Sequence, residues 1–216
     1  NLFEPSRAAV LFGRNECIDC PLQQVRIGDR SLALDSAGNP HVVYAGDLLN
    51  YAHFDGAHWQ VEALGPAPGS DDTYPTFPVI ALSETDVVHL VYANSSNTTL
   101  LHAQKTPGGW QVETVDGGPG ENFGHDVALA LDSDGNPHVA YSSNGRLSYT
   151  VRTPAGWSVQ TIIDQDGWLG WHISLALDSQ DHAHISYYDD TAGRLRYTHW
   201  TGTVWQIETV DASAWL

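Results

Sequence analysis

Histidine has the widest chemical use of any side chain in this sequence, and it recurs at one regular place. His41, His89, His138 and His184 each follow a turn and precede an alternating run that ends in tyrosine. Four imidazoles could bind a metal ion if they met at one point. Equivalent residues of a repeat radiate away from its axis, however, so we expect each histidine to be a hydrogen-bonded strand residue.

A second set of polar residues lies where the first strand of a copy begins. Asp29, Asp126 and His172 align at this position, and His125 precedes Asp126. Side chains there can converge on a central channel, where carboxylate oxygens suit Ca²⁺ or another divalent cation. Asp29, Asp126 and His125 are therefore candidate metal ligands, although no motif in the chain requires a cofactor.

Aromatic residues interrupt the regular pattern in three long loops. The loop residues are Trp168, Trp171 and His172, together with Tyr74 and Phe123 in similarly placed segments. Aromatic rings stack on sugars or fill pockets at protein interfaces. We interpret these five residues as ligand-binding candidates, and the alternative is that they cover the contact between neighbouring repeats.

Catalytic motifs give no positive signal. The chain contains neither G-x-S-x-G nor H-E-x-x-H, which excludes the local signatures of a serine nucleophile elbow and of a zinc protease helix. Carboxylates are plentiful, and a glycosidase needs two of them about 5–9.5 Å apart. Whether such a pair exists depends on three-dimensional spacing.

The elements that must position these residues are four copies of one unit. Tryptophan marks the same place in each copy, at Trp59, Trp110, Trp157 and Trp205, so the period is about 48 residues, which is typical of propeller blades. Each copy contains four short alternating runs rich in Val, Ile, Tyr, Thr and Trp, the composition of β-strands. Turns rich in Gly, Asn and Pro separate the runs.

The repeat predicts an all-β chain, a β-propeller with four recognisable four-stranded blades. We assign residues 31–216 to one propeller domain and residues 1–30 to a closing region, with a strand at residues 8–12 and a cysteine-containing loop. The alternatives are five blades with an incomplete closing blade, or part of a larger ring. Open blade edges favour completion by another chain or a homo-oligomer.

Composition narrows the partners and the compartment. Asp and Glu number 26 against 9 Lys and Arg, for a net charge of −17. This charge repels nucleic acid and anionic membranes, and no apolar run approaches the roughly 20 residues of a membrane helix. Cys17 and Cys20 predict a local disulfide, ahead of a metal or redox role. The chain begins at Asn1 without methionine, which we interpret as the mark of a processed protein, secreted or at the cell surface.

The turn of the third copy carries a family resemblance. Residues 131–141, Leu-Asp-Ser-Asp-Gly-Asn-Pro-His-Val-Ala-Tyr, resemble the Asp-box-like repeats of bacterial extracellular propellers of the sialidase type, and the likeness covers residues 31–211. Asp132 stands three residues before Gly135, whereas the strict motif has two. The resemblance implies a propeller whose Asp turns are structural. A sialidase would also have an arginine triad, and none of the eight arginines recurs in register.

The fourth copy carries a second resemblance. Residues 187–200 with Trp205 resemble a blade of fucose-binding propeller lectins, which hold sugar between blades with Arg, Glu and Trp. The resemblance implies that Arg194 or Arg196 contacts the sugar.

Together these patterns favour a non-catalytic extracellular module that binds a glycan or a protein on its loop face. A sialidase-like carbohydrate-active enzyme and an architectural subunit of a surface assembly are the alternatives.

Overall fold

The computed structural model describes residues 30–45, 48–64, 76–94, 98–118, 120–163 and 169–212. All regular elements in these ranges are β-strands. A helix long and apolar enough to cross a membrane is not found among them. Of the closing region predicted at residues 1–30, residues 1–29, including the cysteine pair, lie outside the described residues.

The strands form four antiparallel sheets, and each sheet uses four consecutive strands in sequence order. We call the sheets blades 1 to 4. Blade 1 contains β1 (Leu32–Leu34), β2 (Pro40–Ala45), β3 (Leu49–Phe54) and β4 (Trp59–Leu64). Blade 2 contains β5 (Thr76–Leu82), β6 (Val88–Ala93), β7 (Thr99–Thr106) and β8 (Gly109–Gly117). Blade 3 contains β9 (Phe123–Leu131), β10 (Pro137–Ser143), β11 (Arg146–Thr153) and β12 (Gly156–Ile163). Blade 4 contains β13 (Leu169–Leu177), β14 (Ala183–Asp189), β15 (Arg194–Trp200) and β16 (Trp205–Asp211).

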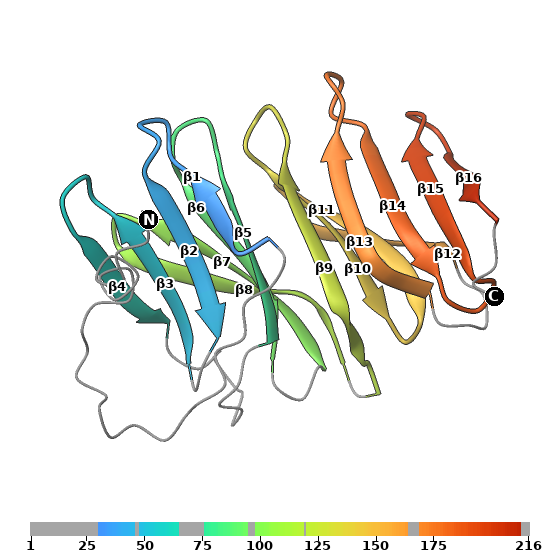
Figure 1. Cartoon of the computed structure of the whole chain (residues 1–216), viewed down its shortest axis with the longest axis horizontal. Coiled ribbons are helices and arrows are strands. Elements are labelled where there is room, and N and C mark those ends of the chain that lie inside the picture. The colour runs from blue at the N-terminus through green and yellow to red at the C-terminus, as the bar shows by residue number, and fades with distance from the viewer. Residues whose placement is uncertain are drawn as a thin grey trace, which may run out of the picture.

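The blades follow one another as a fan, with the first strand of each blade on the inside (Figure 1). β5 contacts both β1 and β9, and β9 contacts β13. The Ile80 amide donates to the Arg30 carbonyl at 3.0 Å, which ties blade 2 to the start of blade 1. The Arg30 guanidinium donates to the Ser174 hydroxyl and so joins the first blade to the fourth. The sequence prediction of a propeller-like fold with four four-stranded sheets is confirmed at this level.

The turn after each inner strand is organised by one side chain. In blade 3, Asp132 Oδ1 accepts from the amides of Asp134 at 3.0 Å and Asn136 at 2.7 Å, while Gly135 supplies a φ of +81°. Asp35 and Asp178 hold the turns of blades 1 and 4 in the same way. We call these the Asp turns. In blade 2 a serine hydroxyl replaces the carboxylate and accepts from two amides.

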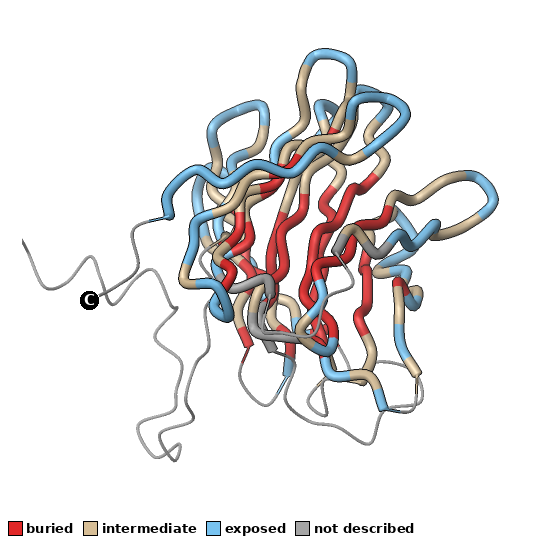
Figure 2. Tube along the Cα trace, turned by 90° about the vertical axis from the view of Figure 1, so that its right-hand side faces the viewer, coloured by how far each residue is buried: buried red, intermediate tan, exposed pale blue. Residues whose placement is uncertain are grey.

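Hydrophobic cores lie between successive blades rather than within one blade, and the buried residues form stripes through the fan (Figure 2). The repeated tryptophan of each following blade meets a ring of the preceding blade edge-on. Its partners are Tyr51 for Trp110, with the ring centres 5.2 Å apart, His102 for Trp157 at 5.3 Å, and Tyr149 for Trp205 at 5.1 Å. Edge-to-face packing at this distance is favourable.

The repeated histidines stay within their own blades. The Nδ1 atoms of His41, His138 and His184 lie 2.5–2.6 Å from a tyrosine hydroxyl on the next strand, and His89 Nδ1 lies 3.0 Å from His102 Nε2. They do not meet at one point, so the prediction of hydrogen-bonded strand histidines is confirmed.

Candidate binding pocket

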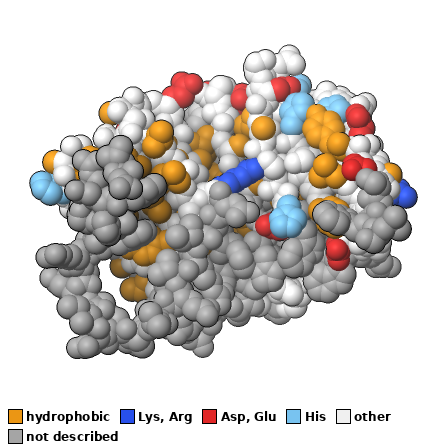
Figure 3. Space-filling view, viewed as in Figure 1, with side chains coloured by type: hydrophobic (Ala, Val, Ile, Leu, Met, Phe, Trp, Pro, Cys, Tyr) orange, Lys and Arg blue, Asp and Glu red, His pale blue; other side chains and the backbone are white. Residues whose placement is uncertain are grey.

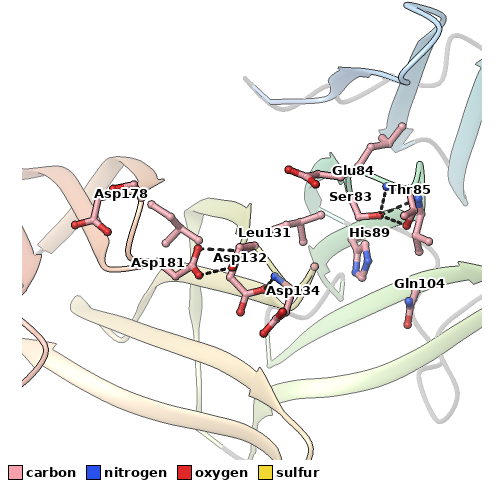
Figure 4. A pocket seen from close by; sticks show the side chains of 16 residues that line it. Ser83, Glu84, Thr85, His89, Gln104, Leu131, Asp132, Asp134, Asp178 and Asp181 are labelled. Carbon is pink, nitrogen blue, oxygen red and sulfur yellow. Dashed lines mark hydrogen bonds between the residues drawn. The ribbon is translucent and has the colours of Figure 1, made fainter.

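A pocket of about 540 Å³ opens at the end of the fan where the inner strands turn back. Its wall is formed by the β5–β6, β9–β10 and β13–β14 turns, with His89 and Gln104 from blade 2. Figure 4 shows Glu84 on the blade 2 side and Asp134 on the blade 3 side, with Asp178 and Asp181 beyond them on blade 4. The pocket therefore lies across three blades.

Neighbouring turns at this end of the fan contact each other through one repeated pair of side chains. Asp86 of blade 2 accepts from the amide and hydroxyl of Ser36 in blade 1, at 2.7 and 2.6 Å. Asp181 of blade 4 accepts from the amide and hydroxyl of Ser133 in blade 3, at 3.0 and 2.7 Å. We call this Ser–Asp pair the turn clamp. Both aspartates have a φ of 61°, a left-handed conformation that Asp tolerates better than most residues.

The seam between blades 2 and 3 lacks both side chains of a turn clamp. The serine position is Glu84 in blade 2, and the aspartate position is Gly135 in blade 3. A Cβ on Gly135 would come 3.7 Å from the Ser83 Cβ, which is ordinary contact, so the space could hold a side chain. The pocket includes this unclamped seam.

Most carboxylates around the pocket are already engaged. Burial alone would raise the pKa of Asp132, but hydrogen bonds from Asn136 and His138 outweigh it and leave that pKa below its ordinary value. The His182 amide is the main cause that lowers the pKa of Asp178. These groups remain ionised at neutral pH and hold backbone, so they are poorly suited to transfer protons.

Two carboxylates and an uncharged histidine are available to a ligand. The Glu84 and Asp134 side chains are exposed and make no hydrogen bond or ion pair with the described residues. Burial, together with the neighbouring His102, lowers the pKa of His89 to about 4, so His89 is neutral at pH 7. With the Gln104 amide, the wall offers acceptors and donors without a visible acid–base pair.

The predicted ligand and metal residues that the structure describes lie at the opposite end of the strands from the pocket turns. His172 is exposed with a φ of 56°, and its amide donates to Asp126 Oδ2 at 2.6 Å. Phe123 is fully buried and packs on Tyr141, with ring centres 5.7 Å apart. The structure thus brings Asp126 and His172 together and places Phe123 in the core.

The other predicted residues that the structure describes lie on β15, β13 and β9. Arg196 Nε donates to Asp189 Oδ2 at 3.2 Å, and Arg194 is exposed at the start of β15. Trp171 lies in β13 and His125 in β9. Trp168, Tyr74 and Asp29, with Cys17 and Cys20, lie outside the described residues. Within the described ranges, no group of three or more metal-ligating side chains is close enough to hold an ion.

Sequence reasoning missed the pocket because it assigned the turns a purely structural role. The signal was present in the aligned turns, where Ser36 and Ser133 are matched by Glu84, and Asp86 and Asp181 by Gly135. What the sequence did not show is that these positions face each other across a seam.

Solved structures of similar fold are known. The chain matches a protein of unknown function from Dyadobacter fermentans with a TM-score of 0.65 and 10% identity, over 89% of this chain and 66% of that one. It matches a triple mutant of AofleA from Arthrobotrys oligospora at 0.57 and 17%, over 86% and 60%. It matches a PL25 ulvan lyase at 0.58 and 14%, over 83% and 57%.

At these identities the likeness establishes the fold, and the chain spans about two thirds or less of these neighbours' length. No protein family matches the chain. No curated protein matches it either. The Asp-box resemblance therefore has no support at the level of sequence families.

Proposed function

We propose that the chain is a non-catalytic extracellular module that binds a neutral glycan in the seam between blades 2 and 3. The observation that carries this proposal is the unclamped seam, where the exposed Glu84 and Asp134 side chains line the same pocket as Gln104. Carboxylates accept strong hydrogen bonds from sugar hydroxyls. The volume of about 540 Å³ falls in the range of small-molecule sites.

Charge and fold support the ligand class. A net charge of −17 disfavours sulfated or uronic ligands, which leaves neutral sugars as the better fit. The ulvan lyase neighbour shares the fold and is bound to a saccharide that is uronic and sulfated, so it supports a glycan ligand in general and the charge alone argues for a neutral one. The space-filling view shows Asp, Glu and His side chains at several places along the blade surfaces, with few cations among them (Figure 3).

A glycan array followed by calorimetric titration of the best hit tests the site. Glu84→Ala combined with Asp134→Ala should weaken binding at least tenfold, since two charge-assisted hydrogen bonds are lost. The matched control is Asp55→Asn, which removes an exposed carboxylate from the β3–β4 turn, outside both candidate sites. Equal affinity for wild type and the double variant would contradict the proposed site.

The loop-face site predicted from sequence is a second candidate, favoured by the exposed Arg194 beside the Asp189–Arg196 pair. Arg194→Ala separates the two sites, because it leaves the pocket unchanged and removes a cation from the loop face. Loss of glycan binding in Arg194→Ala with no effect of Glu84→Ala would favour the loop face.

The enzyme alternative predicts turnover of aryl glycosides. Asp132, Asp178 and Asp181 accept from backbone or serine groups and are not free to act as acid and base, so of the carboxylates that line the pocket only Glu84 and Asp134 could supply a catalytic pair. Measurable release of the aryl group, abolished by Glu84→Ala, would instead favour a hydrolase.

A further inference from the structure

Blade 4 exposes side chains that the other blades bury. Leu195 is 42% exposed, whereas its equivalents Leu49, Leu100 and Leu147 are at most 2% exposed. Val210 is 61% exposed, whereas the matching residues Leu64 of blade 1 and Val115 of blade 2 are only 4% and 5% exposed. In blades 1 to 3 these positions face the following blade, so the exposed face of blade 4 is the surface on which a following blade would pack.

A polar contact accompanies each of the packed faces. Glu62 of blade 1 accepts from Lys105 and from the Trp110 indole of blade 2. Glu113 of blade 2 accepts from Arg152 of blade 3 at 2.9 Å. The cation always lies opposite the repeated tryptophan of its own blade, as the pairs Lys105–Trp110 and Arg152–Trp157 show.

The third interface shows that both partners change together. The glutamate position of blade 3 is Gln160, which accepts from the Trp205 indole at 3.2 Å. The cation position of blade 4 is Trp200, opposite Trp205. The neutral acceptor Gln160 thus faces a blade with the neutral Trp200 at the cation position. The two glutamate acceptors, in blades 1 and 2, each face a blade with a cation there.

Blade 4 itself has a glutamate at this position. Glu208 is exposed, lies opposite Tyr197 on the neighbouring strand and makes no hydrogen bond or ion pair with the described residues. Tyr197 occupies the place of Tyr51 and Tyr149, whose rings receive a tryptophan edge, and no tryptophan of the described blades packs on it. Blade 4 therefore has the apolar, aromatic and charged residues of an interface, but no described blade packs against them.

We propose that this surface, formed by Leu195, Tyr197, Glu208 and Val210, docks a further blade of the same repeat type that presents Lys or Arg opposite its tryptophan. The cation pairs with Glu208, and the tryptophan packs on Tyr197. A second copy of this chain fits less well, because its blade 1 has Phe54 at the cation position and leaves Glu208 without a cation. The proposal is independent of the glycan pocket.

The probe is the chain's own blade 3, which carries Arg152 and docks on a glutamate face in the native fold. A duplicate of residues 120–163 is appended to the full chain after Leu216, and amide hydrogen exchange is measured in β15 and β16. Exchange in both strands should slow at least tenfold relative to the wild-type chain. A duplicate of residues 169–212, with Trp200 at the cation position, is the matched control and should protect less.

A charge swap tests the pairing itself. Glu208→Arg should remove most of the added protection, and Arg152→Glu in the duplicate alone should do the same. Glu208→Arg combined with Arg152→Glu in the duplicate should restore the protection. An interface held by apolar contacts alone would not show this rescue. Unchanged exchange after the blade is appended, or no rescue by the swap, would overturn the proposal. Sedimentation of the wild-type chain adds one outcome: dimers that persist in Glu208→Arg would identify a second copy as the occupant and overturn it too.

Discussion

The histidine pair in blade 2 shows how one substitution changes the chemistry of a repeated position. His41, His138 and His184 have a carboxylate 3.4–3.6 Å from Nε2, whereas blade 2 has Ser83 in place of that aspartate. His89 stacks on His102, with ring centres 5.2 Å apart. Two close imidazoles in a buried site can share a hydrogen bond only while at least one is neutral.

The pair predicts a loss of stability on acidification. The pKa of His89 is about 4 in the folded chain against 6.5 for a free histidine, so folding favours the neutral form. This contribution is complete above pH 6.5 and is lost as the pH falls toward 4, by roughly 3 kcal/mol in total. Urea unfolding at about pH 7 and pH 4.5 measures it, and His89→Gln should flatten the change. If the free energy of unfolding falls as much in His89→Gln as in the wild-type chain, other groups cause the loss.

Burial also lowers the pKa of His41, His102 and His138, so the difference between wild type and His89→Gln, and not the total loss, reports on His89. Hydrogen bonds from Gln60, His58 and Ala57 hold the pKa of Asp55 at about 2, so its contribution is lost only as the pH falls below about 4. The stability that His89 contributes and the stability that Asp55 contributes are therefore lost in different pH ranges.

At the scale of elements, the turns decide both how blades join and where a ligand can enter. A turn clamp joins blades 1 and 2 and blades 3 and 4, and it consists of a serine and an aspartate held at positive φ. Between blades 2 and 3 the same positions are Glu84 and Gly135, and the pocket lies there. The pocket thus includes the unclamped seam and extends along the turns to the clamped Ser133–Asp181 pair.

Installing the missing turn clamp should narrow the part of the pocket between blades 2 and 3. Glu84→Ser with Gly135→Asp recreates the clamp, although the turn must shift from the φ of 81° at Gly135 toward the 61° of Asp86 and Asp181, which offsets part of the gain. We expect stability to rise by about 0.5–1 kcal/mol relative to Glu84→Ser alone, as for an exposed charge-assisted pair. Glycan binding should fall by at least tenfold. Thermal unfolding and titration measure the two effects, and undiminished binding would argue that the ligand does not enter this seam.

The end of β8 offers a test of backbone fit with a neighbouring control. A Cβ on Gly117 would lie 2.8 Å from the Thr98 carbonyl oxygen, while a Cβ on Gly118 would meet nothing within 4 Å. Gly117→Ala should therefore cost about 1–3 kcal/mol and Gly118→Ala almost nothing. Denaturant unfolding of both variants checks the order, and similar midpoints would contradict this geometry.

The strands themselves were predictable from sequence, because alternation along a strand is a local property. The run around Leu129 and the run before Tyr141 fell where β9 and β10 lie. The pocket was not predictable in the same way. Glu84 and Asp134 are far apart in sequence, and only the packing of whole blades brings them to one seam.

At the scale of the whole molecule, the two end blades carry surfaces that the inner blades hide. On blade 1 the exposed residue is Leu32, at 61%, whereas Ile80, Leu129 and Leu175 are 6–7% exposed at the same repeat position. Radial repetition predicted the blades but not which faces would stay open, because each copy has the sequence of a buried unit. The predicted ligand residues could not be assembled either, since Trp168, Tyr74 and Asp29 lie outside the described residues.

These exposures predict unequal costs for the same substitution. Leu129→Ala should destabilise the chain by about 2–5 kcal/mol, the range for a buried leucine. Leu32→Ala should cost less than about 1 kcal/mol, because its side chain leaves water only in part. Urea unfolding of both variants decides it. A large loss in Leu32→Ala would mean that the face of blade 1 is covered in solution.

The alternation of clamped and unclamped seams also bears on how the chain acquired its length. Blades 1 and 3 carry Gly at the left-handed turn position, and blades 2 and 4 carry Asp there. Copying one blade at a time would leave the same turn throughout, whereas duplicating a two-blade segment leaves this alternation. Each later duplication would then add one more seam without a clamp, so an ancestor that grew by pairs would gain cavities in step with its size.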